Sequence, residues 1–147
     1  MTGQAEGGYH GIRAVSGSTG VSPGRAVADE VWDIVCRWNF FQQNTVGIQF
    51  VKAADSIGAN IAEGAGRGTV NDNKRFVRIG RGSFNESHYW LRRCEKRHLV
   101  TPDQSATLRG TLQQLGPSLN GYLNAIGRNA TRSQHKTPNT KFQTLTP

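Results

Sequence analysis

The sequence is poor in cysteine and lacks any long apolar run. Two cysteines among 147 residues are too few for a disulfide framework. No stretch is apolar over the length that a membrane span requires, and no signal-like segment is present. We therefore expect a cytoplasmic protein without a membrane partner, and a chain of this length allows a single domain.

Acidic residues are also scarce, since 10 Asp and Glu stand against 18 Lys and Arg, a net charge of +8. Residues 71–99 carry eight basic and three acidic side chains, a net charge of +5, whereas the rest of residues 25–129 carries six of each. The C-terminal tail adds Arg132, Lys136 and Lys141. A basic excess confined to one segment and one tail is typical of an electrostatic footprint on nucleic acid.

Sizeable apolar side chains are rare at both ends of the chain. Residues 1–24 hold seven glycines, and residues 130–147 hold five threonines and two prolines. Neither end can bury enough apolar surface to offset its ordering entropy. We therefore expect a flexible Gly-rich tail over residues 1–24, a folded domain over residues 25–129, and a flexible basic tail over residues 130–147.

Between the tails, apolar residues recur every three or four positions, which predicts helices and gives almost no support to strands. Heptad-like spacing with short connections favours an all-α fold, an antiparallel up-down-up-down four-helix bundle with disordered tails. The expected core positions are Val27, Val31, Ile34, Trp38 and Phe41 in the first helix, Val46, Phe50, Ala53, Ala54, Ile57 and Ile61 in the second, and Leu108, Leu112, Leu115, Leu119, Tyr122, Leu123 and Ile126 in the last.

Local signals predict where these helices begin and end. The Gly64-Ala65-Gly66 run should terminate the second helix. Thr69 or Asn71 can cap the third. Pro117 lies inside the apolar seam of the last helix, so we expect that helix to be kinked or broken near Gly116.

The third predicted helix, from Lys74 to about His98, has two different faces. Its apolar and small residues fall within an arc of roughly 140° on a helical wheel, which predicts a packing face. Small side chains on that face would let a neighbouring helix come close. The packing face comprises Phe76, Ile79, Gly80, Ser83, Phe84, Ser87, Trp90, Leu91 and Cys94.

The other face of this helix is a stripe of nearly one charge sign. A stripe of mixed sign is usually a solvated face, but cations three, four and seven positions apart can follow a phosphate backbone. The stripe therefore indicates a polyanionic partner. The candidate nucleic-acid-binding residues are Lys74, Arg75, Arg78, Arg81, Tyr89, Arg92, Arg93, Lys96 and Arg97.

Part of the sequence also resembles a known family. The block from Ala54 to Arg67, followed by residues 81–86 and 90–93, resembles bacterial four-helix bundle proteins encoded within intervening sequences of 23S ribosomal RNA genes. A more distant similarity is to the accessory variability protein of diversity-generating retroelements, which works beside a reverse transcriptase. The resemblance implies a ring-shaped homopentamer. It is interrupted at residues 42–47, where many relatives have a Pro- and acid-containing first interhelical turn.

Four polar residues in these blocks are expected to have structural roles. Asn60 lies beside an apolar seam and should be hydrogen-bonded if it is buried. Glu63 stands four positions before Arg67, the favourable order for an ion pair on a helix. Glu86 lies at the edge of the packing face, where an Arg from a neighbouring helix could meet it.

No pattern typical of an enzyme or a metal site is present. The glycines at positions 64, 66 and 68 have neither the preceding strand nor the following Gly-Lys-Ser/Thr of a phosphate-binding loop. Cys94 and His98 are four apart, but no CxxC or HxxxH pair adds ligands, so we expect Cys94 to be a small buried hydrophobe. We expect no catalytic residue, metal or cofactor.

Two functions of different classes are open. The first is a non-catalytic accessory factor that forms a homo-oligomer and binds RNA or single-stranded DNA, with a reverse transcriptase as the partner that the retroelement resemblance suggests. The second is a structural or interaction scaffold whose basic face meets an acidic protein, with no nucleic-acid role.

Overall fold

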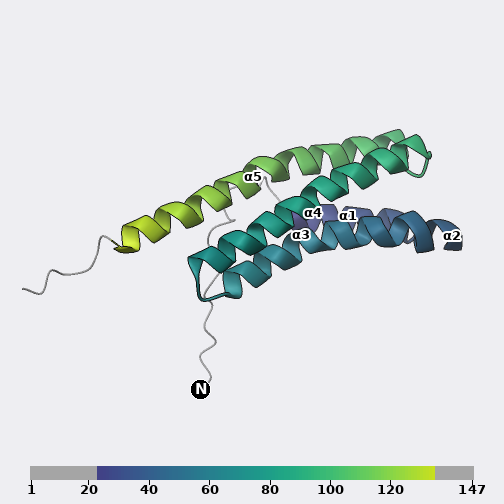
Figure 1. Cartoon of the computed structure of the whole chain (residues 1–147). Helices are drawn as coiled ribbons and strands as arrows, with labels where there is room; N and C mark the ends of the chain where they lie inside the picture. The colour runs from purple at the N-terminus through teal and green to yellow at the C-terminus, as the bar shows by residue number, and fades with distance from the viewer. Residues whose placement is uncertain (1–22, 135–147) are drawn as a thin grey trace, which may run out of the picture.

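The computed structural model describes residues 23–134, with side chains as far as residue 128, and this part of the chain is helical apart from short turns. The elements are α1 (Pro23–Val35), α2 (Phe40–Gln42), the π-helical turn η2 (Gln43–Gly47), α3 (Ile48–Gly66), α4 (Val70–Lys96) and α5 (Pro102–Gln134). Because α2, η2 and α3 follow one another without a gap, the chain forms four helical rods (Figure 1). The predicted all-α four-helix bundle is confirmed.

The helical region extends slightly beyond the domain expected at residues 25–129. α1 begins at Pro23, and α5 continues to Gln134. The expectation of flexible tails concerns residues 1–22 and 135–147, which lie outside the described residues.

The four rods pack as a square in cross-section. α3 packs against α1 and α4, and α5 packs against the same two helices, so α1 and α4 lie on a diagonal. Short turns connect the successive rods, which therefore alternate in direction (Figure 1). The core fills the space between them.

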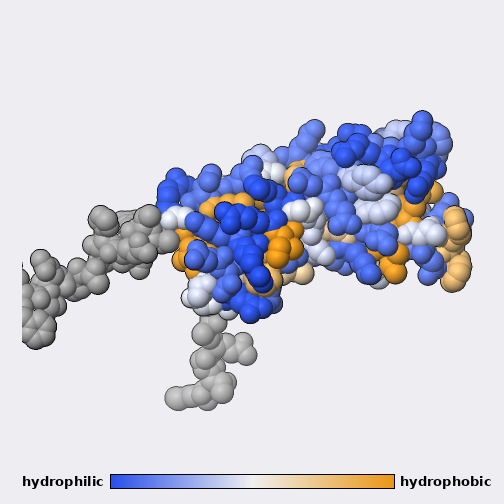
Figure 2. Space-filling view, viewed as in Figure 1, coloured by the Kyte–Doolittle hydropathy of each residue, from blue (hydrophilic) through white to orange (hydrophobic). Residues whose placement is uncertain are grey.

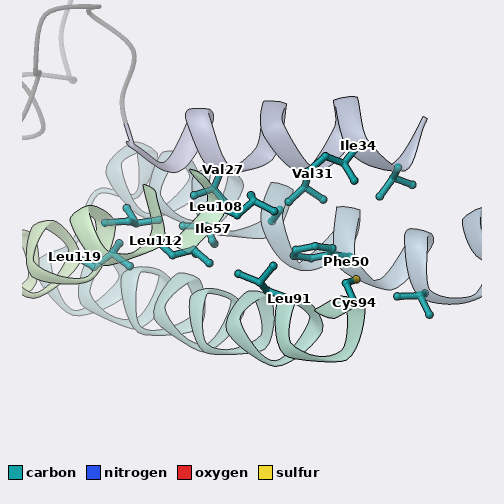
Figure 3. Close-up of a cluster of buried hydrophobic side chains, with 14 of the residues drawn as sticks. Val27, Val31, Ile34, Phe50, Ile57, Leu91, Cys94, Leu108, Leu112 and Leu119 are labelled. Atoms are coloured by element: carbon teal, nitrogen blue, oxygen red, sulfur yellow. The ribbon is translucent and has the colours of Figure 1, made fainter. Parts of the chain in front are cut away.

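The core consists of aliphatic residues, Phe50 and Cys94 (Figure 3). Most of the expected core positions are buried, including all of those from Val46 to Ile61 and those from Leu108 to Leu119. Each fully buried Leu, Ile or Phe contributes about 1.5–3 kcal/mol relative to exposure. The fully buried large side chains are Val27, Val31, Phe50, Ile57, Val77, Leu91, Leu108 and Leu112.

The first helix ends earlier than its apolar pattern predicts. α1 stops at Val35, and Trp38 lies in the turn, where its indole N–H donates to the Leu99 carbonyl at 3.0 Å. Phe41, expected in the core, is 74% exposed on α2. The reason is a capping box, in which the Asn39 side chain accepts from the Gln42 backbone N–H and the Gln42 side chain accepts from the Asn39 N–H.

The first interhelical turn is therefore at residues 36–39, and placing it at residues 42–47 was wrong. Residues 43–47 form η2, whose π-helical geometry brings Gly47 against α1. A Cβ at Gly47 would lie 2.7 Å from Cγ1 of Val35. The Gln43 side chain donates to the carbonyls of Val35 and Cys36, which holds the turn against the end of α1.

Small residues on α4 allow a close approach to α3, as predicted. A Cβ at Gly80 would lie 3.2 Å from the Ile57 carbonyl oxygen. The buried arc, however, is rotated from the expected one, because α4 packs against α5 as well as α3. Val77, absent from the expected packing face, is fully buried, whereas Ile79, which was included, is 45% exposed.

The ends of α4 follow their local signals. Thr69 is the N-cap, and its hydroxyl oxygen accepts from the Asp72 backbone N–H at 3.1 Å. At the other end, His98 has a positive φ of 55°, and the Leu99 N–H donates to the Cys94 carbonyl. This is the geometry of a Schellman-type helix end with a residue other than glycine in the left-handed position.

α5 is a single helix of 33 residues, so of the expected kink or break near Gly116 the break is absent. Pro117 cannot donate to the Gln113 carbonyl, but both residues are exposed, so solvent can satisfy that carbonyl. The ribbon curves without interruption through this point (Figure 1). Gly116 lies against the Phe84 ring of α4.

Candidate nucleic-acid interface

The predicted basic stripe of α4 separates into two rows along the helix. Lys74, Arg78 and Arg81 line a groove between α4 and α5. Arg75 and Arg93 are 18 residues apart, which is five turns of an α-helix, so both project from the same side of α4. That side turns away from α5. The nine candidate residues therefore do not form one continuous site.

The groove between α4 and α5 encloses about 530 Å³ and is mostly polar. From α5 it is lined by Leu123, Asn124, Gly127 and Arg128. A Cβ at Gly127 would lie 3.2 Å from the Lys74 ammonium nitrogen, so this glycine leaves the space that Lys74 occupies. The surface over α4 is predominantly hydrophilic (Figure 2).

The sequence did not predict the α5 side of the groove. Neither Asn124 nor Arg128 is among the candidate residues that the sequence predicts. Their spacing on α5 is helical, but only the packing of α5 on α4 places them opposite Lys74 and Arg78. A single sequence carries no direct signal for that register.

Near the other end of α4, the stripe lies close to Arg109 of α5. Burial, and then Arg92 and Arg109, lower the pKa of His88. Glu95 accepts two hydrogen bonds from the Arg109 guanidinium and one from the Ser105 hydroxyl. Hydrogen bonding from Arg109 is the main reason that the pKa of Glu95 is lowered. Glu95 is thus bonded to side chains of α5. Arg92 and Lys96 are exposed cations on α4 in the same region.

The row that faces away from α5 is partly aromatic. The Arg75 guanidinium lies 5.1 Å from the centroid of the Phe76 ring, and the Arg67 guanidinium lies 5.0 Å from it. Tyr89 is 49% exposed and packs edge-to-face with Trp90 at 5.1 Å between centroids. Tyr89 does not line the α4–α5 groove, so base stacking on it would take place outside the groove.

The polar motif residues have structural contacts, with one difference from expectation. The Asn60 side chain donates to the Ser56 carbonyl at 2.7 Å, and Arg67 forms the predicted ion pair with Glu63. The expectation that Glu86 meets an Arg from a neighbouring helix was wrong. Glu86 instead accepts from the Trp90 indole N–H at 3.2 Å, because the two side chains are one turn apart on α4.

The two cysteines are free thiols at separate positions. Cys94 is fully buried, as predicted, and burial raises the pKa of its thiol to about 12. Cys36 is exposed. Within residues 23–128, no three His, Cys, Asp or Glu side chains come together as a group that could hold a metal ion. None of the described helices has the length and apolar character of a membrane span.

Fold and surface together define a small helical bundle protein with a basic face. The model of the 23S rRNA-intervening sequence protein family matches residues 21–121, and the chain belongs to this family. A solved structure of a protein of unknown function from the S23 ribosomal protein family of Bacteroides thetaiotaomicron has the same fold, with a TM-score of 0.53 and 20% identity. The match covers 69% of this chain and 98% of that one. No curated protein matches the chain.

Proposed function

We propose that this protein is a non-catalytic accessory factor that binds RNA or single-stranded DNA and assembles as a closed homo-oligomer. The observation that carries the nucleic-acid role is the α4–α5 groove. Lys74, Arg78 and Arg81 are the residues that α4 contributes to it, and none is acidic. Phosphate oxygens are the ligands that best match a row of ammonium and guanidinium groups.

The groove favours contacts to the backbone over reading of bases. Its three α4 cations are spaced three or four residues apart, about 5 Å along the helix axis, so they form one row of positive charge on the same side of α4. Its lining contains no aromatic ring. Binding should therefore show little sequence preference and a strong dependence on salt, with a log–log slope of about −0.7 per phosphate neutralised on a single strand.

The proposal contains no catalytic step. The two glutamates that could act as acid and base, Glu63 and Glu86, interact with Arg67 and Trp90 respectively. The buried Cys94 thiol is a poor nucleophile, because burial raises its pKa.

Assembly is supported by exposed aromatic surface. Trp32 is 58% exposed, Phe40 81% and Phe41 74%, and hydrophobic residues gather at the α2 end of the molecule (Figure 2). A contiguous exposed apolar patch often marks a surface that contacts another protein. The family resemblance points to five subunits. Light scattering at micromolar concentration should give several times the chain mass of 16.1 kDa, and a value of one chain mass would contradict assembly.

A triple variant tests the groove. Replacing Lys74, Arg78 and Arg81 with Gln removes three charges and keeps helix propensity. Arg25, Arg37 and Lys52 are exposed, lie outside α4, and provide a control triple with the same loss of charge. Binding of a fluorescent single-stranded RNA should weaken at least tenfold in the groove triple at physiological salt. Its salt slope should become shallower by about 2.

The control triple should bind with nearly parental affinity. Equal weakening in both triples would mean that net charge alone attracts RNA. If the groove triple bound RNA like the parent, the nucleic-acid role would be wrong, and the scaffold that meets an acidic protein would become the better hypothesis. A reverse transcriptase gene beside the gene for this protein would support a retroelement role, whereas a position within a ribosomal RNA gene would support the intervening-sequence role.

A further inference from the structure

The first helix is short and leaves a hollow beyond its N-terminal end. α1 begins at Pro23, and a Cβ at Gly24 would lie 3.8 Å from Cγ2 of Ile57 on α3. α3 continues to Gly66, about two turns past the start of α1. Because α1 packs against both α3 and α5, its late start leaves the space between those two helices uncovered. The hollow at this point has a volume of about 340 Å³.

The hollow has one wall of large apolar side chains and one of small residues. Leu115, Leu119 and Tyr122 of α5 form the large wall. Leu119 lies at the end of the row of core side chains, near the start of α1 (Figure 3). Its volume and mainly apolar lining match the clefts of about 300–1,000 Å³ that hold small molecules in proteins. The small residues that line the opposite side are Gly24, Ala28, Gly58, Ala59 and Ala62.

Gly58 lies in the middle of the small-residue wall. Asp55 precedes it by three residues and Ala62 follows by four, so the three residues share one side of α3, and all three line the hollow. A Cβ at Gly58 would have nothing within 4 Å, so this glycine is not required for contact with a neighbouring helix. Glycine inside a helix is less favourable than alanine. A larger side chain at position 58 would therefore take up space in the hollow without a clash.

The sequence just before α1 contains little that could fill the hollow. Residues 16–22 read Ser-Gly-Ser-Thr-Gly-Val-Ser, so Val21 is the one sizeable apolar residue in the seven positions before Pro23. One valine side chain is much smaller than a space of 340 Å³. An external molecule is thus a better occupant than the preceding chain.

Charges of both signs surround the opening of the hollow. Arg25 and Asp55 line it, and burial, followed by the charge of Asp29, raises the pKa of Asp55. Lys52 is exposed on α3, about one turn before Asp55. Two cations therefore stand against two acids, which favours neither an anion nor a cation. An uncharged molecule also has the lowest cost of transfer from water into an apolar site.

We propose that this hollow, the α1–α3–α5 pocket, binds a small, uncharged and mainly apolar molecule. The ligand lies between Leu119 and Tyr122 on one side and Gly58 on the other. Removal of its apolar surface from water drives binding. The pocket shares no lining residue with the α4–α5 groove, so this site is separate from the proposed nucleic-acid site.

The pocket is tested in the full chain with N-phenylnaphthylamine, an uncharged probe whose fluorescence rises in apolar surroundings. The parent should bind it saturably, with one probe per chain. Gly58→Ala should weaken binding, and Gly58→Leu should raise the dissociation constant at least tenfold, because the larger side chain occupies more of the pocket. Both variants replace a helical glycine, so circular dichroism should stay helical and the Tm should not fall.

The matched control is Gly82→Leu. A Cβ at Gly82 on α4 also has nothing within 4 Å, and Gly82 does not line the pocket. This variant should bind the probe with parental affinity, and Gly58→Leu should bind RNA like the parent. Equal probe affinity in Gly58→Leu and the parent would overturn the pocket.

The charge of the ligand is tested with anilinonaphthalene sulfonate, which adds a negative charge to the same ring system. Its binding that is lost in Gly58→Leu should be at least tenfold weaker than that of the uncharged probe at physiological salt. Tighter binding of the sulfonate at this site would overturn the uncharged class of ligand. Probe binding that appears only after removal of residues 1–22 would mean that the chain itself fills the pocket. Binding that appears only on dilution to single chains would mean that a second copy covers it, and either result would overturn the proposal.

Discussion

The Thr111 hydroxyl of α5 donates to Oε1 of Glu30 on α1 at 2.9 Å, which joins the two helices through residues that are 81 positions apart in sequence. The second oxygen, Oε2, is buried without a hydrogen-bond partner among the described residues. Burial is the main reason that the pKa of Glu30 is raised, and the bond from Thr111 opposes this. The carboxylate is therefore held at a position that favours its neutral form.

Replacing Glu30 with Gln should stabilise the protein at pH 7. The amide oxygen can still accept from Thr111, and no charge remains to be desolvated. Because the folded pKa of Glu30 is raised, its neutral form adds stability at low pH, and that contribution is lost as the pH rises through the folded pKa. Differential scanning calorimetry should show a higher Tm for Glu30→Gln at pH 7. The difference should shrink below pH 4.5, the usual pKa of glutamate, and a lower Tm at pH 7 would be the contrary result.

Gly80 and Gly82 should respond oppositely to added side chains. A Cβ at Gly80 would press on the Ile57 carbonyl at 3.2 Å, whereas nothing lies within 4 Å of one at Gly82. Gly80→Val should cost about 1–3 kcal/mol through overpacking between α3 and α4. Gly82→Ala should gain up to about 1 kcal/mol from helix propensity. Urea unfolding would check both, and equal effects at the two sites would contradict the close helix contact.

His88 should make stability depend on pH near neutrality. Its imidazole packs edge-to-face on Phe84 at 4.7 Å between centroids, and its pKa is lowered by burial, Arg92 and Arg109. Because the unfolded state binds the proton first, stability present above the usual pKa of 6.5 is lost as the pH falls toward the folded value. The Tm of the parent should fall between pH 7.5 and 5.5. His88→Gln should lessen this fall, and an identical pH profile in the two proteins would refute the role of His88.

Removing residues 1–22 and 135–147 should leave the bundle folded. The composition of these ends predicts little apolar burial. Helical circular dichroism per core residue and Tm should stay nearly unchanged in the shortened chain. A fall in Tm beyond about 5 °C, on the order of 1 kcal/mol, would show that one end contributes to the folded domain.

Most of the fold could be predicted because helical periodicity reflects burial against neighbours. The prediction failed where a local polar contact overrides that periodicity. Phe41 continues the apolar spacing of α1, yet the Asn39 capping box starts a new helix and leaves Phe41 exposed. Val77 is buried and Ile79 exposed, the reverse of the prediction, because the buried side of α4 depends on its packing against both α3 and α5. A single sequence does not specify how neighbouring helices align.

The candidate site, too, could be predicted only in part, because its layout depends on how the helices pack. The charge of α4 is visible in the sequence, but its division into a groove and a separate face follows from where α5 packs. Lys74, Arg78 and Arg81 are placed together by the fold, whereas Arg75 and Arg93 belong to the other side of the helix.

Because the helices differ in length, the backbone at one end of the bundle should be less protected from solvent than at the other. α1 has 13 residues, about 20 Å, whereas α5 has 33, about 50 Å. Since Gly24 lies level with Ile57, the last turns of α3 and the first turns of α4 extend beyond α1. Backbone amides at that end should exchange with solvent sooner than those around Phe50 and Leu108. Lys74 and Arg78 lie in this less protected region, so a nucleic acid held there would slow amide exchange most where the free protein opens most readily.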